Sequence, residues 1–473
     1  MTAVDNGRRS WSAADLDAAA RSLAQTLTAQ GTRVLATLMD NTPAWVVADR
    51  ACAQAQVVHV PLPLFFSAEQ ISHVLGTAGI DTLLTLRALA ARWPSAPASD
   101  VDIADEPLVM VRLPFRAPQM PAGTTKITFT SGTTGAPKGV CLGADSMQSV
   151  ADGLVQALHP LDIRRHLCAL PFPVLLENIA GLMAPLARGA TCIVLPLKEL
   201  GLEGSSRFDA TRFSAVVQRH QPNSIILLPQ MLRAWVHHLL ATGERAPASL
   251  RMVAVGGAAV GSRLLAAARS VGVPAYEGYG LSEGASVQTL NLPGAERHGS
   301  AGRALPHARL RIAADGEIEI AGSLFSGYLG DPIPPPDWWP TGDLGSIDED
   351  GFVYVRGRKK MVLITSFGRN VSPEWIETQL RDESAIAQAV VLGDGQATLS
   401  SVLWPLQPET TDAELQAAVN AANARLPDYA RVHRWSRGRA PFDAASGMAT
   451  PNGRPQRAAI LAAHADALGI SSI

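Results

Sequence analysis

Near the start of the chain, apolar residues recur three or four positions apart over residues 13–29, which is the spacing of an amphipathic helix. Ser12 stands where an N-cap is expected, and Gly31 lies just beyond the end. An apolar run at 34–39 follows and predicts a buried strand. The chain is therefore expected to begin with a helix that leads into a buried strand.

The same alternation continues as far as residue 85. Helices are predicted at 44–55 and 68–77, and strands at 57–60 and 82–85. Strands that alternate with helices indicate βαβ units and a layered α/β architecture. Residues 87–119 show a weaker pattern, and we expect a loop-rich connection there.

A second layered half is predicted further along the chain. Strands are expected around Cys168, at 224–228 and at 252–255, followed by a turn near Gly278. Within 309–320, apolar residues alternate on both sides of Asp315-Gly316, which predicts a β-hairpin. The expected fold class is α/β, with a large layered N-terminal domain of βαβ units plus a β-rich subdomain.

Composition narrows the class of protein. With 473 residues, 47% hydrophobic and 17% charged, the chain is globular and too long for one ordinary domain. A formal net charge of −2 gives no reason to expect nucleic acid or an anionic membrane as partner. No run of about 18 apolar residues occurs, so we expect a cytoplasmic protein without a transmembrane segment. The four cysteines form no C-x-x-C pair, which favours free thiols over a metal–thiolate site.

The chemically most informative segment is residues 130–139, Thr-Ser-Gly-Thr-Thr-Gly-Ala-Pro-Lys-Gly, which lies between two short apolar runs. Its glycines let backbone N–H groups approach an anion, its hydroxyl groups add donors, and Lys138 supplies a cation. The spacing differs from that of a P-loop NTPase, because no Ser or Thr follows the lysine. The segment therefore predicts a phosphate-binding turn, with a flexible polar linker as the alternative.

Further short motifs follow this segment in order. They are Gly256-Gly257-Ala258, Tyr279-Gly280-Leu281-Ser282-Glu283, residues 299–303, Gly316-Glu317-Ile318, Thr341-Gly342-Asp343 and Gly357-Arg358-Lys359-Lys360. Together with the phosphate-binding segment they resemble the adenylate-forming (AMP-binding) superfamily, which includes acyl-CoA synthetases, peptide-synthetase adenylation domains and beetle luciferases. The resemblance covers nearly the whole chain.

The resemblance implies two domains. Residues 1–357 would form the adenylate-forming domain with the ATP and acid pocket, and residues 358–473 a small mobile α+β lid with a hinge near Lys360. In the family this lid swings between two half-reactions, although a rigid C-terminal domain is the alternative. The segment that contains Gly368 resembles long-chain acyl-CoA synthetases, where this glycine would border the pantetheine tunnel.

The resemblance also implies roles for individual residues. Lys138 and the loop would hold the β- and γ-phosphates, Ser282 would donate to the α-phosphate, and Glu283 would bind Mg²⁺. Tyr279 would stack on adenine, Asp343 would accept from the ribose hydroxyls, and Arg358 would support that end. The expected catalytic residues are Lys138, Glu283, Arg358 and Arg454, and the expected cofactor-binding residues are Thr130, Ser131, Gly132, Thr133, Thr134, Gly135, Gly257, Ala258, Tyr279, Gly280, Ser282 and Asp343. Taken singly, several of these residues fit a turn or helix cap equally well.

Two positions depart from the family pattern. The family carries a Lys near the C-terminus where this chain has Arg454, and no lysine follows Lys360. Arg spreads its charge over a planar fork, so the exchange is not conservative. Arg454 either supports adenylation or leaves that step slowed, altered or lost. The bland explanation for its presence is drift, because this chain is rich in arginine. Val174 stands where a His or aromatic residue is usual, which predicts an apolar acyl or aryl pocket, while Glu177 and Asn178 beside it would meet a polar substrate group or cap a helix.

The predicted function is ATP-dependent adenylation of a fatty or aromatic carboxylic acid, giving acyl-AMP and pyrophosphate, followed by acyl transfer to a thiol. ATP and Mg²⁺ would be cofactors, and CoA or the phosphopantetheine of an acyl carrier protein would be the acceptor. Two alternatives stay open: an adenylating enzyme with another acceptor, such as an amine or an inorganic nitrogen anion, and a catalytically impaired nucleotide-binding homologue. The sequence leaves the acid, the oligomeric state and the resting domain pose open.

Overall fold

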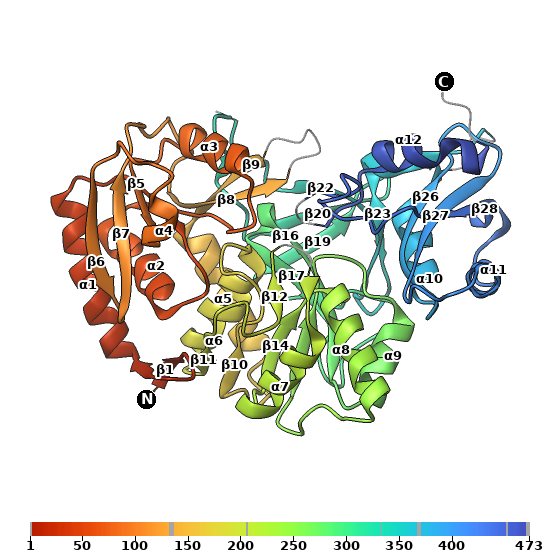
Figure 1. The fold of residues 1–473 in the computed structure, drawn as a ribbon, viewed down its shortest axis with the longest axis horizontal. Coiled ribbons are helices and arrows are strands. Elements are labelled where there is room, and N and C mark those ends of the chain that lie inside the picture. The colour runs from red at the N-terminus through yellow and green to blue at the C-terminus, as the bar shows by residue number, and fades with distance from the viewer. Residues whose placement is uncertain are drawn as a thin grey trace.

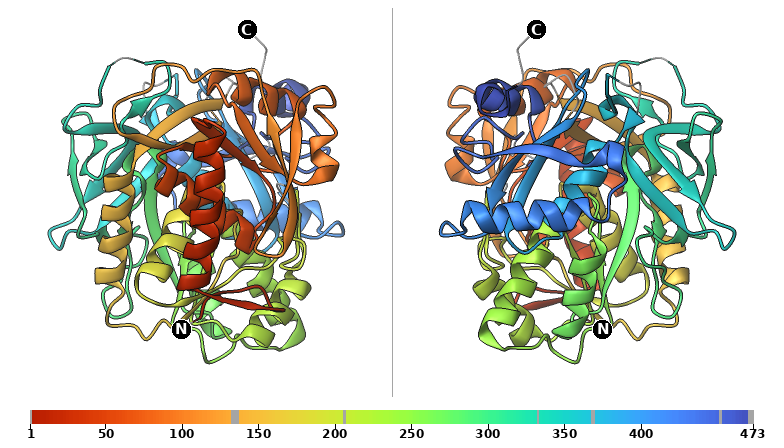
Figure 2. Two further views of the ribbon diagram at one scale, coloured as in Figure 1. Left: turned by 90° about the vertical axis from the view of Figure 1, so that its left-hand side faces the viewer. Right: turned by 90° about the vertical axis from the view of Figure 1, so that its right-hand side faces the viewer.

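The computed structural model describes residues 2–131, 137–204, 207–331, 333–366, 370–450 and 453–469. Two large sheets and a smaller antiparallel sheet occupy most of the molecule, and a three-stranded sheet with its helices lies at one end (Figure 1). In Figure 2, the N-terminal helix α1, in red, faces the viewer on the left, and the C-terminal domain, in blue, faces the viewer on the right. The expected α/β class with a large N-terminal and a small C-terminal domain is confirmed.

The first large sheet has the strand order β21-β9-β8-β4-β3-β5-β7-β6. Its parallel centre comprises β3 (Val34–Leu38), β4 (Val58–Pro61) and β5 (Thr82–Thr85), connected through α2 (Pro43–Ala55) and α3 (Ala68–Thr77). Ser12 caps α1 (Ala13–Ala29) in a capping box with Asp15, as the polar N-cap position predicts. The predicted helices and strands of this region are confirmed to within one residue at most ends.

The expected loop at 87–119 is wrong over most of its length. A short helix α4 (Arg87–Ala90) precedes a hairpin of β6 (Ala98–Ile103) and β7 (Glu106–Arg112), which ends the sheet. Strand β6 is an edge strand with mostly exposed residues, so it shows no apolar alternation. Its turn at Ala104 and Asp105 adopts positive φ without a glycine, which removed the usual hairpin signal as well.

The second large sheet has the order β18-β17-β16-β15-β14-β10-β11-β1-β2. Its core is apolar on both faces and is covered by the helices α5 to α9 and by a π-helix, η1 (Glu177–Met183). The elements of this part are β1 (Thr2–Asp5), β2 (Ser10–Ser12), α5 (Ala144–Ala157), β10 (Arg165–Leu167), α6 (Ala184–Ala187), β11 (Thr191–Ile193), β12 (Leu202–Glu203), β13 (Arg207–Phe208), α7 (Ala210–His220), β14 (Ser224–Leu227), α8 (Pro229–Thr242), β15 (Met252–Val255), α9 (Ser262–Ser270), β16 (Ala275–Leu281), η2 (Ser282–Gly284), β17 (Ser286–Leu290) and β18 (Arg303–Ala304).

The turn expected near Gly278 is also wrong, because this glycine lies within β16. A Cβ atom on Gly278 would lie 2.9 Å from the carbonyl oxygen of Thr289 on the antiparallel neighbour β17. The glycine therefore permits close approach of two strands, which sequence alone does not distinguish from a turn. The chain reverses further on, at η2 and Ala285.

The β-rich subdomain is an antiparallel sheet of order β19-β20-β22-β23. The predicted hairpin is confirmed as β19 (Ala308–Ile312) and β20 (Glu317–Gly322), and β22 (Trp339–Ile347) and β23 (Val353–Arg358) complete the sheet. The short strand β21 (Gly327–Tyr328) crosses from here to the first large sheet and pairs with β9.

The C-terminal domain is built on β26 (Ile386–Leu392), β27 (Leu399–Pro405) and β28 (Val432–Arg437). The chain enters it through η3 (Lys359–Met361), the paired short strands β24 (Leu363–Ile364) and β25 (Asn370–Val371), and then α10 (Pro373–Arg381). Its remaining elements are α11 (Asp412–Asn423), η4 (Asp428–Ala430) and α12 (Arg457–Leu468).

Two expectations about the whole chain can be compared with the described residues. Within these ranges, no helix combines the length and the apolar character needed to cross a bilayer. All four cysteines are buried and free, as their spacing predicts.

Candidate active site

The predicted phosphate-binding segment, residues 130–139, begins in β8 (Thr124–Ser131) and ends in β9 (Pro137–Gly143), which pair as an antiparallel hairpin. Thr130 pairs with Lys138, and Ser131 pairs with Pro137, so the two strands close to the base of the loop. Residues 132–136, which include the predicted Gly132, Thr133, Thr134 and Gly135, lie outside the described residues. The two flanking strands agree with the prediction, while the turn between them and phosphate binding stay predictions.

Tyr328 connects Lys138 to Glu283. The Lys138 ammonium nitrogen lies 5.6 Å from the centroid of the Tyr328 ring, within the range of a cation–π contact. The Tyr328 hydroxyl donates a hydrogen bond of 2.7 Å to Glu283 Oε1, and burial followed by the Glu283 charge raises the pKa of Tyr328. The structure therefore brings together the predicted cation and the predicted metal-binding acid. No motif pointed to Tyr328, because its role depends on the crossing of β21 to β9.

The second group of predicted residues is centred on Asp343, whose carboxylate has two side-chain partners. The Tyr279 hydroxyl donates to Asp343 Oδ2 over 2.7 Å, and Arg358 Nε lies 2.8 Å from Oδ1. Asp343 and Arg358 are direct partners on β22 and β23, so the register of the hairpin sets this ion pair. Burial raises the pKa of Asp343, while Arg358 and Tyr279 act in the opposite direction.

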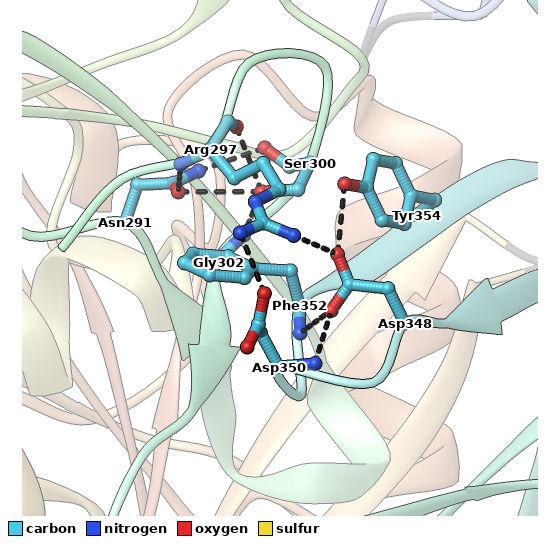
Figure 3. A network of polar contacts seen from close by, with 8 residues as sticks. All are labelled: Asn291, Arg297, Ser300, Gly302, Asp348, Asp350, Phe352 and Tyr354. Carbon is cyan, nitrogen blue, oxygen red and sulfur yellow. Dashed lines mark hydrogen bonds and ion pairs between the residues drawn. The ribbon is translucent and has the colours of Figure 1, made fainter.

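A polar network anchors the hairpin that carries Asp343 and Arg358 (Figure 3). The Arg297 guanidinium bridges Asp348 Oδ2 at 2.9 Å and Asp350 Oδ2 at 2.7 Å, at the tip between β22 and β23. Asn291 accepts from the Arg297 backbone N–H over 3.0 Å and holds the other end of the loop. Residues 299–303, one of the ordered motifs, thus belong to a loop that anchors the hairpin.

The remaining predicted cofactor residues lie near the carboxyl ends of β15 and β16, which are neighbouring parallel strands. Gly257, with φ of +83°, and Ala258 follow β15 and are exposed. Gly280 lies in β16, where a Cβ atom would fall 2.0 Å from the carbonyl oxygen of Ser286. Ser282 begins η2 directly before Glu283. In open α/β sheets this edge is where ligands bind, so these positions agree with a site.

Arg454, in the C-terminal domain, lies close enough to Asp343 and Glu283 to interact with their charges. Its guanidinium acts to lower the pKa of Asp343, and Glu374, Asp343 and Glu283 in turn stabilise the charged form of Arg454. Burial first, and Arg358 second, lower the pKa of Arg454, although the residue remains solvent-accessible. The structure therefore joins all four predicted catalytic residues in one region.

Glu177 and Asn178 do not occupy the positions expected for a helix cap. Both are buried, and η1 has no side-chain cap. Asn178 Oδ1 accepts from the Lys126 ammonium over 2.5 Å, and Lys126 in turn pairs with Asp49. Burial raises the pKa of Glu177, with His166 acting in the opposite direction. The helix-cap interpretation is therefore wrong, since these side chains point into the core.

Comparison with known proteins identifies the family. Residues 1–329 match the AMP-binding enzyme family, and residues 360–469 match the AMP-binding enzyme C-terminal domain. Long-chain-fatty-acid–CoA ligase FadD15 of Mycobacterium bovis is 28% identical over 460 residues, with 82% of this chain and 75% of that protein covered. Feruloyl-CoA synthase of an Amycolatopsis species is 29% identical over 427 residues, with 83% and 82% covered.

A solved structure agrees with these matches over the whole fold. The o-succinylbenzoate-CoA synthetase MenE of Bacillus subtilis, in complex with its acyl-adenylate intermediate, superimposes with a TM-score of 0.78 at 25% sequence identity, covering 97% of this chain and 94% of that chain. The resemblance inferred from the ordered motifs is thereby confirmed. The chain belongs to the AMP-binding enzyme family, and the relatives named here are CoA ligases or synthases.

Proposed function

We propose that this chain is an AMP-forming acid–thiol ligase that activates an apolar fatty or aromatic carboxylic acid and transfers its acyl group to CoA. In the first step a carboxylate oxygen attacks the α-phosphorus of ATP, and the bond to pyrophosphate breaks. In the second step the thiol sulfur attacks the acyl carbon, the bond to AMP breaks, and the thiol proton is released. The observation that carries the proposal is the convergence of Lys138, Glu283, Asp343 and Arg358 in one region of an AMP-binding enzyme fold.

Asp343 suits the ribose end of the nucleotide. An ionised carboxylate offers about four lone-pair sites, and the Tyr279 hydroxyl and Arg358 use one on each oxygen. The remaining sites can accept the two ribose hydroxyls without loss of the existing contacts. Tyr279 packs beside Ile318 and Val353 and keeps its hydroxyl on Asp343, so its ring would be available as the adenine platform.

Lys138, Tyr328 and Glu283 suit the phosphate end. Tyr328 donates to Glu283 Oε1, and among the described residues no carboxylate forms an ion pair with Lys138. A carboxylate oxygen is the hard ligand that Mg²⁺ takes together with substrate phosphates. Mg²⁺ held by Glu283 would neutralise phosphate charge, while Lys138 would attract the departing pyrophosphate.

The C-terminal domain would supply Arg454 in the present pose and move for thiol transfer. Lys359 is tied to the β-rich subdomain, since its ammonium nitrogen lies 2.5 Å from Asp315 Oδ2 and 2.8 Å from Glu317 Oε2. A pivot directly after this residue, at Lys360, leaves these ion pairs intact. This supports the proposed hinge near Lys360, with Arg358 and Lys359 remaining on the β-rich subdomain.

Acid-dependent exchange of pyrophosphate into ATP, measured over a panel of fatty and aromatic acids, tests the first step. Exchange should occur with one class of acid. Lys138→Ala should lower the rate on the order of 10²–10³-fold, because charge stabilisation in the transition state is removed. The exposed Lys198→Ala is the matched control and should keep the wild-type rate. Exchange that survives in Lys138→Ala would contradict the proposal.

Arg454 favours a second candidate, an adenylating enzyme with an amine or inorganic nitrogen anion as acceptor. The guanidinium faces the region of Asp343 and Glu283 where the family has a lysine. Arg454→Lys separates the two: faster or unchanged adenylation with CoA as acceptor supports the thiol ligase, whereas loss of rate together with amine-dependent AMP release in the wild type supports the second candidate.

A further inference from the structure

A fully enclosed group of metal-ligating side chains lies apart from the nucleotide site, between the second large sheet and η1. His166 lies on β10, Cys168 follows that strand, and Glu177 is the first residue of η1. One ligand atom from each of the three lies within 4.8 Å of the others, and all three residues are buried. Among the described residues this is the group whose geometry fits a metal ion.

The polar atoms of this group lack the partners that buried polar atoms normally have. Among the described residues, no hydrogen bond reaches either oxygen of Glu177 or Nε2 of His166, and Glu177 Oε1 lies 3.7 Å from that nitrogen. The backbone N–H groups of Ala169 and Leu170 face the carboxylate but do not reach hydrogen-bonding geometry. A buried carboxylate without partners is costly, so the arrangement calls for a compensating group.

The chain shapes the space around Glu177. A Cβ atom on Gly181 would lie 2.5 Å from Glu177 Oε1, so the carboxylate folds back over a residue that has no side chain. The Gly181 carbonyl accepts from the Cys168 thiol at 3.4 Å and is 3.9 Å from the Cys192 sulfur. Cys192 is the strand partner of His166 on β11, which places a second thiol beside the trio. The π-helix thus turns a carboxylate and a carbonyl toward two cysteines.

His166 is held in the orientation of a metal ligand. Its Nδ1 lies 2.8 Å from the Ser224 hydroxyl oxygen, on the neighbouring strand β14. When Nδ1–H donates to this oxygen, Nε2 carries the lone pair and points to Glu177. A hydrogen bond that fixes the tautomer in this way accompanies most metal-bound histidines.

We propose that His166, Cys168 and Glu177 bind a Zn²⁺ ion in the core, through one ligand atom from each residue. Imidazole nitrogen, thiolate sulfur and carboxylate oxygen are the ligands that zinc takes at about 2.0–2.3 Å, which places tetrahedral ligand atoms about 3.3–3.8 Å apart. Small rotations bring the trio from its present spacing to that range. A neutral imidazole, a thiolate and a carboxylate also balance the charge of one divalent ion, which an enclosed site requires. The site is distinct from the predicted Mg²⁺ position at Glu283.

Metal analysis of the full chain, produced without a metal-affinity tag and grown with zinc, tests the proposal. After gel filtration, plasma mass spectrometry should find one zinc per chain in the wild type and in Cys141→Ala, a buried cysteine outside the group. Cys168→Ala and Glu177→Gln should lose it. Stoichiometric zinc that persists in both of these variants, or its absence from the wild type, would overturn the proposal.

Cobalt gives a second readout that does not depend on how well a variant folds. Wild-type chain should be unfolded with a chelator and refolded with Co²⁺ alone, and it should then show a thiolate-to-cobalt charge-transfer band. Co²⁺ bound to surface histidines cannot produce this band, because the band requires a thiolate ligand. All four cysteines are buried, so a thiolate ligand must come from the core. Refolding with chelator only should lower the melting temperature, and added Zn²⁺ should restore it. No band and no change in melting temperature would exclude the site.

Discussion

Asp343 and Glu177 are both buried carboxylates, yet their surroundings differ completely. Asp343 receives a hydrogen bond from Tyr279 on β16 and an ion pair from Arg358 on the neighbouring strand β23. Glu177 has no hydrogen-bond partner among the described residues and lies beside the His166 imidazole and the Cys168 thiol. A buried carboxylate that already pairs with a positive side chain can accept hydrogen bonds from a neutral polar ligand. A buried carboxylate without such a partner needs a bound cation or a proton to compensate its charge.

Asp49, like Asp343, pairs with a positively charged side chain. Its substitution should give the largest effect on stability. It pairs with Lys126 at 2.8 Å and lies 2.6 Å from His59 Nδ1. Asp49→Ala should lower the free energy of unfolding by about 3–5 kcal/mol, because it leaves the Lys126 charge buried and unpaired. Urea unfolding measures the loss. Asp17→Ala, which breaks the exposed pair with Arg50, is the control and should cost less than about 1 kcal/mol.

Asp343→Ala should give the largest effect on ligand binding. Loss of the ribose acceptor, together with an unpaired Arg358, should weaken ATP binding by about 2–5 kcal/mol, as calorimetric titration would measure. Glu177→Gln should leave ATP affinity unchanged at a temperature where it is folded, and so should the exposed Asp412→Ala. Equal losses in Asp343→Ala and Glu177→Gln would break the distinction between the two carboxylates.

Glu277 is another carboxylate for which burial raises the pKa, so the pH dependence of stability tests the same contrast. Burial raises the pKa of Glu277 from 4.5 to about 7, and so does the nearby Asp382, while the Val260 backbone N–H is its one hydrogen-bond donor among the described residues. The folded state therefore holds a proton that the unfolded chain releases between pH 4.5 and 7. Stability should fall as pH rises through this window, by on the order of 1–3 kcal/mol.

Thermal unfolding of wild type and Glu277→Gln across that window measures the effect. The neutral amide should remove the part of the decline that belongs to this group, so the two curves should converge at low pH and separate near neutrality. Parallel curves at all pH values would show that Glu277 has an ordinary pKa.

Tyr328→Phe should give the smallest of these effects. Removal of the hydroxyl leaves the ring beneath Lys138 but frees Glu283 Oε1, at a cost of about 1.5 kcal/mol for a hydrogen bond to a charged group. Pyrophosphate exchange should slow by about tenfold. Tyr354→Phe, which removes a hydroxyl from Asp348 in the anchoring network, is the matched control and should change the rate less. An unchanged rate in Tyr328→Phe would remove Tyr328 from the site.

Much of the fold follows from the sequence because local signals and burial agree. Helix α1 has its cap at Ser12, its buried stripe and its end at the predicted residues. The edge hairpin of β6 and β7 could not be found in this way, because an exposed strand carries no apolar alternation and its turn uses no glycine. The apolar pattern of a sequence indicates which residues are buried. It therefore does not detect an exposed edge strand, which is stabilised mainly by pairing with its one neighbour.

The site divides along the same line. Lys138, Glu283 and Asp343 could be predicted because each lies in a contiguous motif, and the order of these motifs along the chain resembles a known family. Tyr328 depends on a crossing between two sheets, and the group around Glu177 depends on strand neighbours and a π-helix. The cysteine spacing indicated no metal–thiolate site, because His166 and Cys192 become neighbours only through the pairing of β10 and β11. Contacts set by topology are therefore the part that local sequence reasoning misses.

Product analysis tests the central claim most directly. The chain should be incubated with ATP, Mg²⁺, CoA and each acid of a fatty and aromatic panel, and the products identified by mass spectrometry. The proposed ligase predicts acyl-CoA and AMP in equal amounts with one class of acid, and no ADP. Formation of ADP, or of AMP without a thioester under any acid, would contradict an AMP-forming acid–thiol ligase.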